Sequence, residues 1–251
     1  MSGHFIGAVL VADVRVSFPS GEYDMLRKIH PVAPSIALGF AGSVQVGFEM
    51  VDLLEDYIGN AGLGDSPPTG RIVHKWWRHA RRHWKSADAK QRKHGCQLIV
   101  AGARPAKGVV NPNIAYRLSA PEFEPETIDR QPKSVGSGNG VASYRKLLGQ
   151  SGLQWYQQYQ QHPQFMQPSA GPLGVFGDIL RAEIAKTPVK SVSGHLHLCV
   201  VRFDDTLWDN NDTTLKNGQP WAMPTVATDR TSYLNLVKQY GLAAEAEAGV
   251  A

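Results

Sequence analysis

The chain has 251 residues, of which 42% are hydrophobic and 19% are charged, so it can bury a sizeable core and is not broadly disordered. It contains no apolar run of about 18 residues, which excludes an ordinary transmembrane helix. The first residues, MSGHFIGAVLVAD, lack a basic leader and predict a strand rather than a signal peptide. Cys96 and Cys199 each lie in an apolar run, which favours free buried thiols and a cytoplasmic protein.

The formal net charge of +4 is unevenly distributed. Residues 71–93 hold nine Lys and Arg side chains and one acid, Asp88, whereas the rest of the chain has 17 basic and 21 acidic residues. This segment could meet nucleic acid or an acidic neighbouring subunit, and we expect the subunit. His79 and His83 have the spacing of a metal-binding pair, but a third ligand is not evident, so we expect a solvated helix face and no metal.

In chain order, the apolar pattern first predicts a strand over 7–18 that continues past the acid at position 13. A turn at Ser20-Gly21 and a strand over 35–41 follow. From residue 44 to residue 58, apolar side chains recur at helical spacing, and a Gly- and Pro-rich loop ends that helix. Residues 71–93 predict a second helix, with tryptophans along its apolar stripe.

The second half begins with predicted strands over 96–103 and 113–119, and a short one near 124–129. A GSGNG turn at 136–140 leads into a helix, and a Gln-rich stretch within 150–170 predicts an inserted loop. The last predicted elements are a helix over 173–187, a strand over 195–203, a helix over 231–247, and a frayed tail over 240–251. Strands and helices are grouped rather than alternating, so the sequence predicts one α+β domain, 1–251, with two antiparallel sheets between helix layers.

Three residues near the start have a spacing that indicates a polar pocket. Asp13 ends an apolar strand in VLVADVRVS, Lys28 follows in LRKIHP, and Gly42 lies in the turn GFAGS before a helix. Two strands and a helix N-terminus could converge there and activate an amine or a hydroxyl. Each residue also has an ordinary interpretation, because Asp13 could be a strand-end acid, Lys28 a solvated lysine, and Gly42 a helix cap or tight turn.

These parts suit an enzyme whose nucleophile is its own N-terminal residue. The hydroxyl of that residue attacks, and its free α-amine, with a pKa of about 8, accepts the proton. A nearby lysine raises the positive potential and favours the neutral amine, and an acid holds that lysine in place. Backbone N–H groups at a glycine turn before a helix can stabilise the tetrahedral oxyanion.

The ordered set resembles the proteasome β-subunit and its HslV-like bacterial relatives. That family has an acid after its second strand, a lysine in the same K-I context, a glycine ahead of its first helix, a later GSG turn and a final Ser-Gly pair. The matching residues here are Asp13, Lys28, Gly42, Ser137 and Ser193. The resemblance extends over residues 7–60, 134–148 and 171–203, and the order of the motifs is more specific than any one of them.

The resemblance implies a four-layer αββα sandwich of the N-terminal-nucleophile hydrolase type. It also implies a threonine-type peptidase subunit that acts on peptides or unfolded proteins in a homo-oligomeric ring, with an ATPase as a candidate partner. No metal or organic cofactor is implied. In this interpretation Lys28 tunes the nucleophile's amine, Asp13 holds Lys28, the N–H of Gly42 stabilises the oxyanion, and Ser137 and Ser193 orient the amine.

Two departures leave open whether the chain is an enzyme. The family's threonine is absent, and only Met1–Phe5 precede the predicted hairpin turn. Removal of Met1 would expose Ser2, a competent hydroxyl nucleophile, or the threonine could lie upstream of an internal Met1. The second departure is Lys190, which stands where the family has an acid three residues before its final serine. The alternatives are therefore a non-catalytic structural subunit of such a ring and, less favoured, a nucleic-acid-binding protein that uses residues 71–93.

Overall fold

The computed structural model describes residues 8–62, 68–103, 115–128, 133–147, 149–150, 171–201, 206–208, 213–216, 219–222 and 224–247. The strands are β1 (Ala8–Asp13), β2 (Arg15–Phe18), β3 (Gly21–Asp24), β4 (Ile29–Ala33), β5 (Ile36–Gly42), β6 (Cys96–Gly102), β7 (Ala115–Ser119), β8 (Glu126–Thr127), β9 (Leu196–Val201), β10 (Thr206–Trp208), β11 (Thr213–Lys216) and β12 (Gln219–Ala222). The helices are α1 (Val44–Asn60), α2 (Thr69–Ser86), α3 (Ala89–Arg92), the 3-10 turn η1 (Ser137–Gly140), α5 (Gly171–Lys186), α6 (Arg230–Gln239) and α7 (Ala243–Glu247).

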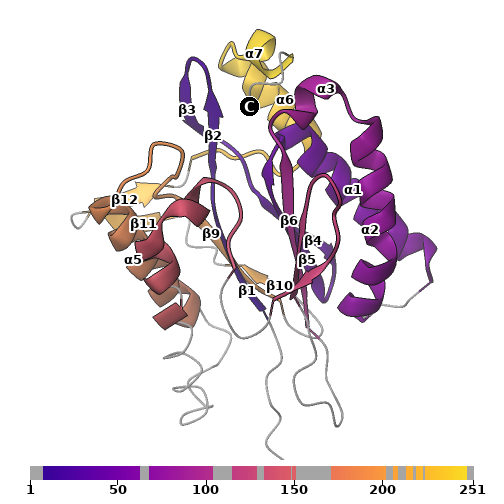
Figure 1. Cartoon of the computed structure of the whole chain (residues 1–251). Coiled ribbons are helices and arrows are strands. Elements are labelled where there is room, and N and C mark those ends of the chain that lie inside the picture. The colour runs from indigo at the N-terminus through magenta and orange to yellow at the C-terminus, as the bar shows by residue number, and fades with distance from the viewer. Residues whose placement is uncertain are drawn as a thin grey trace, which may run out of the picture.

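The strands form two larger antiparallel sheets and two hairpins. One sheet has five strands in the order β4-β5-β6-β7-β8, and the other has three in the order β1-β9-β10. The β2–β3 and β11–β12 pairs are hairpins. In Figure 1, α1 and α2 lie on one side of the strands and α5 lies on the other, where it packs against β9. Strand β1 contacts both β4 and β6, so the two sheets face each other.

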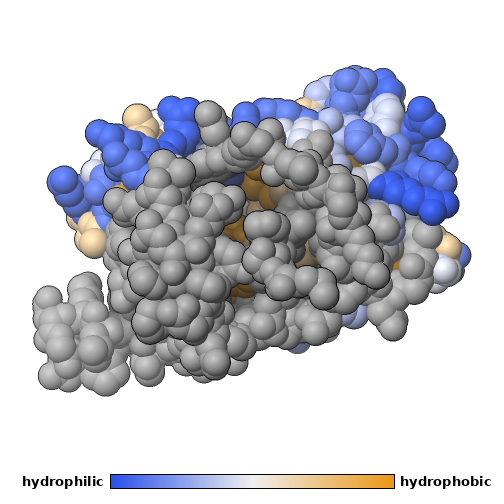
Figure 2. All heavy atoms as spheres, turned by 90° about the horizontal axis from the view of Figure 1, so that it is seen from below, coloured by the Kyte–Doolittle hydropathy of each residue, from blue (hydrophilic) through white to orange (hydrophobic). Residues whose placement is uncertain are grey.

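In Figure 2, hydrophilic residues lie along the upper edge of the view, on its left side as well as on its right. The outer faces of helices α1 and α2 are polar, and their inner faces are apolar. Across the described ranges, the helices are each too short or too polar to cross a lipid bilayer.

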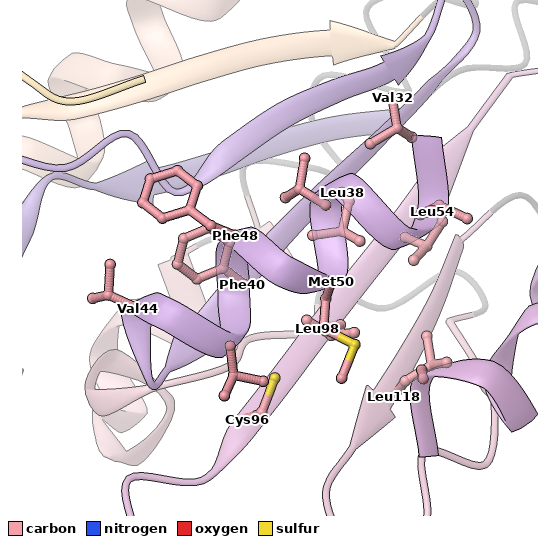
Figure 3. Packing of buried hydrophobic residues seen from close by; sticks show 14 of the residues in the cluster. Val32, Leu38, Phe40, Val44, Phe48, Met50, Leu54, Cys96, Leu98 and Leu118 are labelled. Carbon is pink, nitrogen blue, oxygen red and sulfur yellow. The ribbon is translucent and has the colours of Figure 1, made fainter. Parts of the chain in front are cut away.

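The largest apolar cluster lies between the five-stranded sheet and helices α1 and α2. Leu38 and Phe40 project from β5 toward Phe48 and Met50 of α1, and Leu98 of β6 continues this layer (Figure 3). The same cluster includes the side of α2 that carries the tryptophans. Large aliphatic and aromatic side chains therefore join this sheet to its helices.

The facing surfaces of the two sheets are built from smaller side chains. Ala37, Ala101 and Ala103 lie in one cluster with Leu10 of β1 and Cys199 of β9. Since residues alternate along a strand, Ala37 faces this cluster while its neighbour faces α1. The small residues let the two sheets approach closely. A third cluster joins α5 to the other face of the three-stranded sheet.

The predicted strand over 7–18 is two strands in different sheets. Strand β1 pairs with β9, whereas β2 pairs with β3. The break has a local cause, because the Asp13 carboxylate accepts a hydrogen bond from the Arg15 backbone N–H at 2.8 Å. This contact closes a turn over residues 13–15, in which Val14 is buried.

The predicted helix over 71–93 is also divided, into α2 and α3. Asp88 begins α3 by accepting a hydrogen bond from the Lys90 backbone N–H at 2.7 Å, and the preceding Ala87 is extended. Aspartate at such a position competes with helix continuation through its own backbone contacts. The apolar stripe with Trp76 and Trp84 is buried, as predicted.

The frayed tail predicted over 240–251 stays a prediction, although residues 243–247 form the short helix α7. Helix α6 ends at Gln239. Gly241, two residues later, has a φ of +72°, and the Leu242 N–H donates to the Val237 carbonyl at 2.8 Å. This is a Schellman-type ending, in which the residue after the glycine packs on the last helical turn. Leu242 is buried and α7 follows it. The inserted loop predicted within 150–170 lies outside the described residues, apart from residue 150.

Candidate functional site

The Asp13–Lys28 pair bridges the two sheets. Asp13 ends β1, and Lys28 immediately precedes β4, where its carbonyl accepts a hydrogen bond from the Phe40 N–H at 3.0 Å. The Lys28 Nζ donates to Asp13 Oδ1 over 3.0 Å, and both side chains are less than one fifth exposed, at 18% and 19%. The contact between these two residues that the spacing predicted is therefore present.

Gly42 lies at the end of β5, directly before α1. Its φ of +102° is one that L-residues rarely adopt, and a Cβ there would stand 2.5 Å from the Gly95 carbonyl oxygen. Ser43 follows as the N-cap of α1, with its Oγ accepting from Val46 N–H and donating to Gln91. Backbone geometry thus explains why glycine stands at this position, and the start of a 17-residue helix follows it.

The 136–140 turn lies beside the end of β5. The Gly136 N–H donates to Gln97 Oε1 at 3.0 Å, and a Cβ on Gly136 would lie 3.0 Å from that of Ala41. On its other side, a Cβ on Gly138 would lie 3.9 Å from Val192 Cγ2. The turn therefore connects the neighbourhood of the oxyanion candidate with that of the final serine, and Ser137 in it is exposed.

Ser193 is fully buried and hydrogen-bonded to an acid that the sequence did not reveal. Its Oγ donates to Asp24 Oδ2 at 2.5 Å and accepts from the His195 backbone N–H at 2.9 Å. The same Asp24 oxygen lies 2.9 Å from His195 Nδ1. The sequence predicts no acid beside Ser193, because Lys190 stands three residues before it. The structure supplies an acid from β3 instead.

Arg15 completes this cluster from β2. Its guanidinium donates to both Asp24 oxygens, at 2.7 Å from Nε and 3.2 Å from Nη2. It also donates to the backbone carbonyls of Lys190 and Val192. The fork geometry of arginine suits a carboxylate. The guanidinium thereby ties the β2–β3 hairpin to the segment that carries Ser193.

The electrostatics of the cluster favour an ionised Asp24. Burial by itself would raise the pKa of this carboxyl, but hydrogen bonds from His195, Arg15 and Ser193 outweigh it and hold the pKa well below its ordinary value. The hydrogen bond to Asp24 likewise raises the pKa of Arg15. The pair is a stable anion and cation next to the Asp13–Lys28 pair, since the Arg15 N–H bonds Asp13.

One signal in the sequence could have located this cluster. The turn predicted at Ser20-Gly21 lies one residue earlier, at Pro19-Ser20, because Gly21 already pairs with Phe18. This two-residue turn in RVSFPSGEYD places Arg15 directly opposite Asp24. Opposite charges at such positions commonly pair across two strands. His195 directly precedes β9, and its ring contacts the same carboxylate.

The other predicted candidates have different positions. Ser2 belongs to the segment 1–7, which lies outside the described residues. His83 Nε2 contacts Glu49 Oε2 at 2.9 Å, while the His79 ring lies against Tyr57. Within the described part of the chain, no three or more His, Cys, Asp or Glu side chains are arranged to hold a metal ion.

Arg15 links the Asp13–Lys28 pair to the Asp24 cluster, because its backbone N–H donates to Asp13 and its guanidinium donates to Asp24. The Lys28 ammonium could raise the positive potential for a reacting amine, and the turn residues could position one. Ser193, which is fully buried with its hydroxyl directed at Asp24, is suited to hold structure rather than to attack a substrate. The sequence matches no known family model, and no curated protein is significantly similar to it.

Proposed function

We propose that this chain is a proteasome-like subunit of the N-terminal-nucleophile hydrolase type, which cleaves amide bonds in peptides or unfolded proteins. In this proposal the two sheets and their helices correspond to an αββα sandwich, and the subunits assemble into a homo-oligomeric ring. The observation that carries the proposal is the Lys28 Nζ to Asp13 Oδ1 contact of 3.0 Å, held between the two sheets. A lysine placed there with limited exposure is unusual for a merely solvated side chain.

The chemistry would proceed through an ester intermediate. The hydroxyl oxygen of the nucleophile bonds to the substrate carbonyl carbon, and the hydroxyl proton passes to the α-amine. The carbon–nitrogen bond then breaks as that proton moves to the leaving amine. Water hydrolyses the ester and restores the hydroxyl. The nucleophile would come from the segment before β1, in which Ser2 is a hydroxyl residue.

The site residues have distinct roles in this scheme. The Lys28 charge favours the neutral form of the α-amine, and Asp13 keeps Lys28 in position. The backbone N–H of Gly42, at the start of α1, stabilises the oxyanion. Ser137 and Ser193 orient the α-amine of the nucleophile. In this scheme Asp24 takes the place of the acid that the family has three residues before its final serine, where this chain has Lys190.

Covalent labelling tests the proposal. A peptide epoxyketone or boronate is incubated with the native protein, and the adduct is located by mass spectrometry. We expect an adduct in the N-terminal segment that is lost in Lys28→Ala. The matched control is Lys238→Ala, because Lys238 is exposed on α6 and lies outside the site. Equal labelling of Lys28→Ala and the unchanged protein would contradict the assigned role of Lys28.

A non-catalytic structural subunit is the second candidate. The observation that favours it is that the polar groups satisfy one another, since Lys28 pairs with Asp13 and the buried Ser193 pairs with Asp24. Mass spectrometry of the native N-terminus separates the two candidates. An intact Met1 or an acetylated Ser2, together with absence of labelling, would support the structural subunit and contradict the peptidase.

A further inference from the structure

The outer face of α2 carries five exposed cations in one row, here called the cationic stripe. Its members follow one another at intervals of four, three, four and three residues, so they project from one side of the helix. The opposite side, with Val73, Trp76 and Ala80, is buried against the sheet. The stripe extends about 21 Å along the helix, at about 1.5 Å per residue. It consists of Arg71, Lys75, Arg78, Arg82 and Lys85.

Helix α3 continues this positive surface. Three further exposed cations lie in α3 and its C-cap, namely Lys90, Arg92 and Lys93. The Arg92 Nη1 donates to the Lys85 carbonyl at 3.3 Å, which holds α3 against the end of α2. The one acid between residues 71 and 93 is Asp88, and its carboxylate already accepts a hydrogen bond from the Lys90 backbone N–H. The two helices therefore present a surface of nearly uniform charge.

Nothing in the described part of the chain neutralises the stripe. None of its side chains forms an ion pair with a described residue. On one flank of α2, Arg81 contacts Glu122. On the other flank, His83 contacts Glu49 of α1, whose Oε1 also lies 3.7 Å from Arg230 Nη1 of α6. Unpaired cations in a row repel one another, so an anionic partner would stabilise this surface.

The regular spacing of the stripe suits a polymer with regularly spaced negative charges. A nucleic acid duplex carries one phosphate per about 3.4 Å of axis on each strand, so about six phosphates of one strand lie within the length of the stripe. Three of the five cations are arginines, whose fork geometry suits phosphate oxygens. We propose that the cationic stripe binds the phosphodiester backbone of a double-stranded nucleic acid without reading its base sequence. This activity lies beyond the peptidase function proposed above.

A protein partner suits this face less well. The centre of a protein–protein interface is depleted of charged residues and is anchored by aromatic or apolar side chains. Trp76 and Trp84 cannot serve as such anchors, because they are buried in the core of this chain. Trp77 is half-buried, and Cζ of Arg78 lies over its ring, 5.3 Å from the centroid. The burial of the tryptophans is therefore the reason to prefer a nucleic acid over the acidic subunit that the sequence alone favours.

A single strand and a membrane surface also fit this face less well than a duplex. Proteins that bind single strands stack bases on exposed aromatic rings, whereas every member of the stripe is Arg or Lys. Helices that bind membranes insert an apolar face, but the apolar face of α2 packs on the five-stranded sheet. Among the described residues, the large exposed hydrophobic side chains are Leu234 and Tyr240, which belong to α6 and its C-cap. A duplex backbone, by contrast, is bound chiefly by cations.

Fluorescence anisotropy on the full chain tests this inference. A labelled DNA duplex of about 24 base pairs is titrated with the protein from about 50 to 300 mM NaCl, and a second duplex differs in base composition. We expect equal affinity for both, with a dissociation constant of about 10⁻⁶ to 10⁻⁴ M near physiological salt. The logarithm of the association constant should fall against the logarithm of the salt concentration with a slope of about −4, since each phosphate contact contributes about −0.9.

Neutralising two members of the stripe should weaken binding by a defined amount. In Arg78→Gln with Arg82→Gln, we expect the affinity at low salt to fall at least about tenfold and the salt slope to become shallower by about 2. Arg71→Gln with Lys75→Gln, at the other end of the stripe, should have the same effect, because the row acts as one surface. Unchanged binding in both double variants would overturn the inference.

The matched control is Arg145→Gln with Lys238→Gln, which removes the same charge at exposed positions outside α2 and α3. It should bind as the unchanged chain does, and circular dichroism should show that all variants are folded. Equal weakening in the control, or no binding by the unchanged chain at about 50 mM NaCl, would overturn the inference. So would tighter binding of a poly-glutamate peptide, or binding to phosphatidylserine vesicles without binding to the duplex. Lys28 lies outside the stripe, so failure of the labelling experiment leaves these outcomes unaffected.

Discussion

Asp24 joins three separate stretches of chain through one carboxylate. Arg15 reaches it from β2, and Ser193 and His195 reach it from the segment before β9. The acceptor of each hydrogen bond is the ionised Asp24 carboxylate, so these bonds are stronger than hydrogen bonds between neutral groups. The β2–β3 hairpin, which belongs to neither of the larger sheets, is fixed to the body of the molecule by this carboxylate.

Replacing this carboxylate by an amide should destabilise the protein. In Asp24→Asn, Arg15 loses its counter-ion and one acceptor becomes a donor, so we expect the free energy of unfolding at pH 7 to fall by about 2 kcal/mol. Urea denaturation measures this change. The exposed Glu124→Gln is the control and should change it by less than about 0.5 kcal/mol.

The pH dependence of this loss has a definite sign. Because the pKa of Asp24 is lower in the folded chain than in the unfolded chain, its contribution is present above the ordinary carboxyl pKa of about 4. The contribution is lost as the pH falls from there through the lowered folded pKa. The difference between the unchanged protein and Asp24→Asn should therefore narrow below about pH 4. A difference that stays constant down to pH 3 would show that the charge of Asp24 is not responsible.

The sequence predicts contacts between residues that are close in the chain better than contacts between residues that are far apart in it. The Asp13–Lys28 contact follows from two strands that lie close in sequence, and it is present. The acid that Ser193 contacts lies 169 residues before it, so inspection of the residues around Lys190 could not find it. Distant partners depend on how the hairpin docks, which no local pattern encodes.

Elements with strong periodicity were predicted to within a few residues, whereas their breaks were not. Helix α1 and strands β5 and β6 have continuous apolar patterns, and their bounds agree closely with the predictions. The breaks after β1 and after α2 depend on single aspartates, Asp13 and Asp88, which bond nearby backbone N–H groups. Apolar periodicity does not reveal these breaks, because a hydrogen bond from an aspartate side chain to a backbone N–H leaves the hydrophobic pattern of the sequence unchanged.

The junction between β5 and α1 requires glycine for a structural reason that can be measured. In Gly42→Ala the Cβ would stand 2.5 Å from the Gly95 carbonyl oxygen in an unfavourable backbone conformation. We expect a loss of about 2 kcal/mol or more in thermal or urea unfolding. Gly59→Ala is the matched control, because it lies within α1 and its Cβ would have nothing within 4 Å. The control should be neutral or more stable by up to about 1 kcal/mol.

A stable Gly42→Ala would contradict this structural role. The expected loss also affects how the site is tested. A variant that unfolds loses activity whatever the N–H of Gly42 does, so Gly42→Ala cannot report on the oxyanion. Lys28→Ala is the cleaner probe, since the Lys28 side chain is 18% exposed and can be shortened without a steric clash.

Among the described residues, three apolar clusters share strands. Strand β5 contributes Leu38 to the cluster under α1 and Ala37 to the cluster between the sheets. Strand β9 contributes Leu198 to the cluster under α5 and Cys199 to the one between the sheets. Because neighbouring residues on one strand belong to different clusters, no cluster can open without disturbing the strand that supports the next.

The two cysteines lie in different clusters, so their reactivity can show whether these clusters unfold together. Cys96 lies in the cluster under α1 and Cys199 in the one between the sheets, and neither is in a disulfide. Burial raises the pKa of each thiol to about 12. At pH 8 both should therefore resist iodoacetamide in the native protein and react only through opening of the fold.

If the clusters unfold together, the two thiols should become reactive over the same range of urea concentration, as measured by mass spectrometry of their peptides. Their reactivities in fully denaturing urea provide the reference rates. Reaction of Cys199 at urea concentrations where circular dichroism remains native, with Cys96 still protected, would show that the three-stranded sheet separates first. The Asp13–Lys28 pair bridges the same two sheets, so such a separation would also open the candidate site.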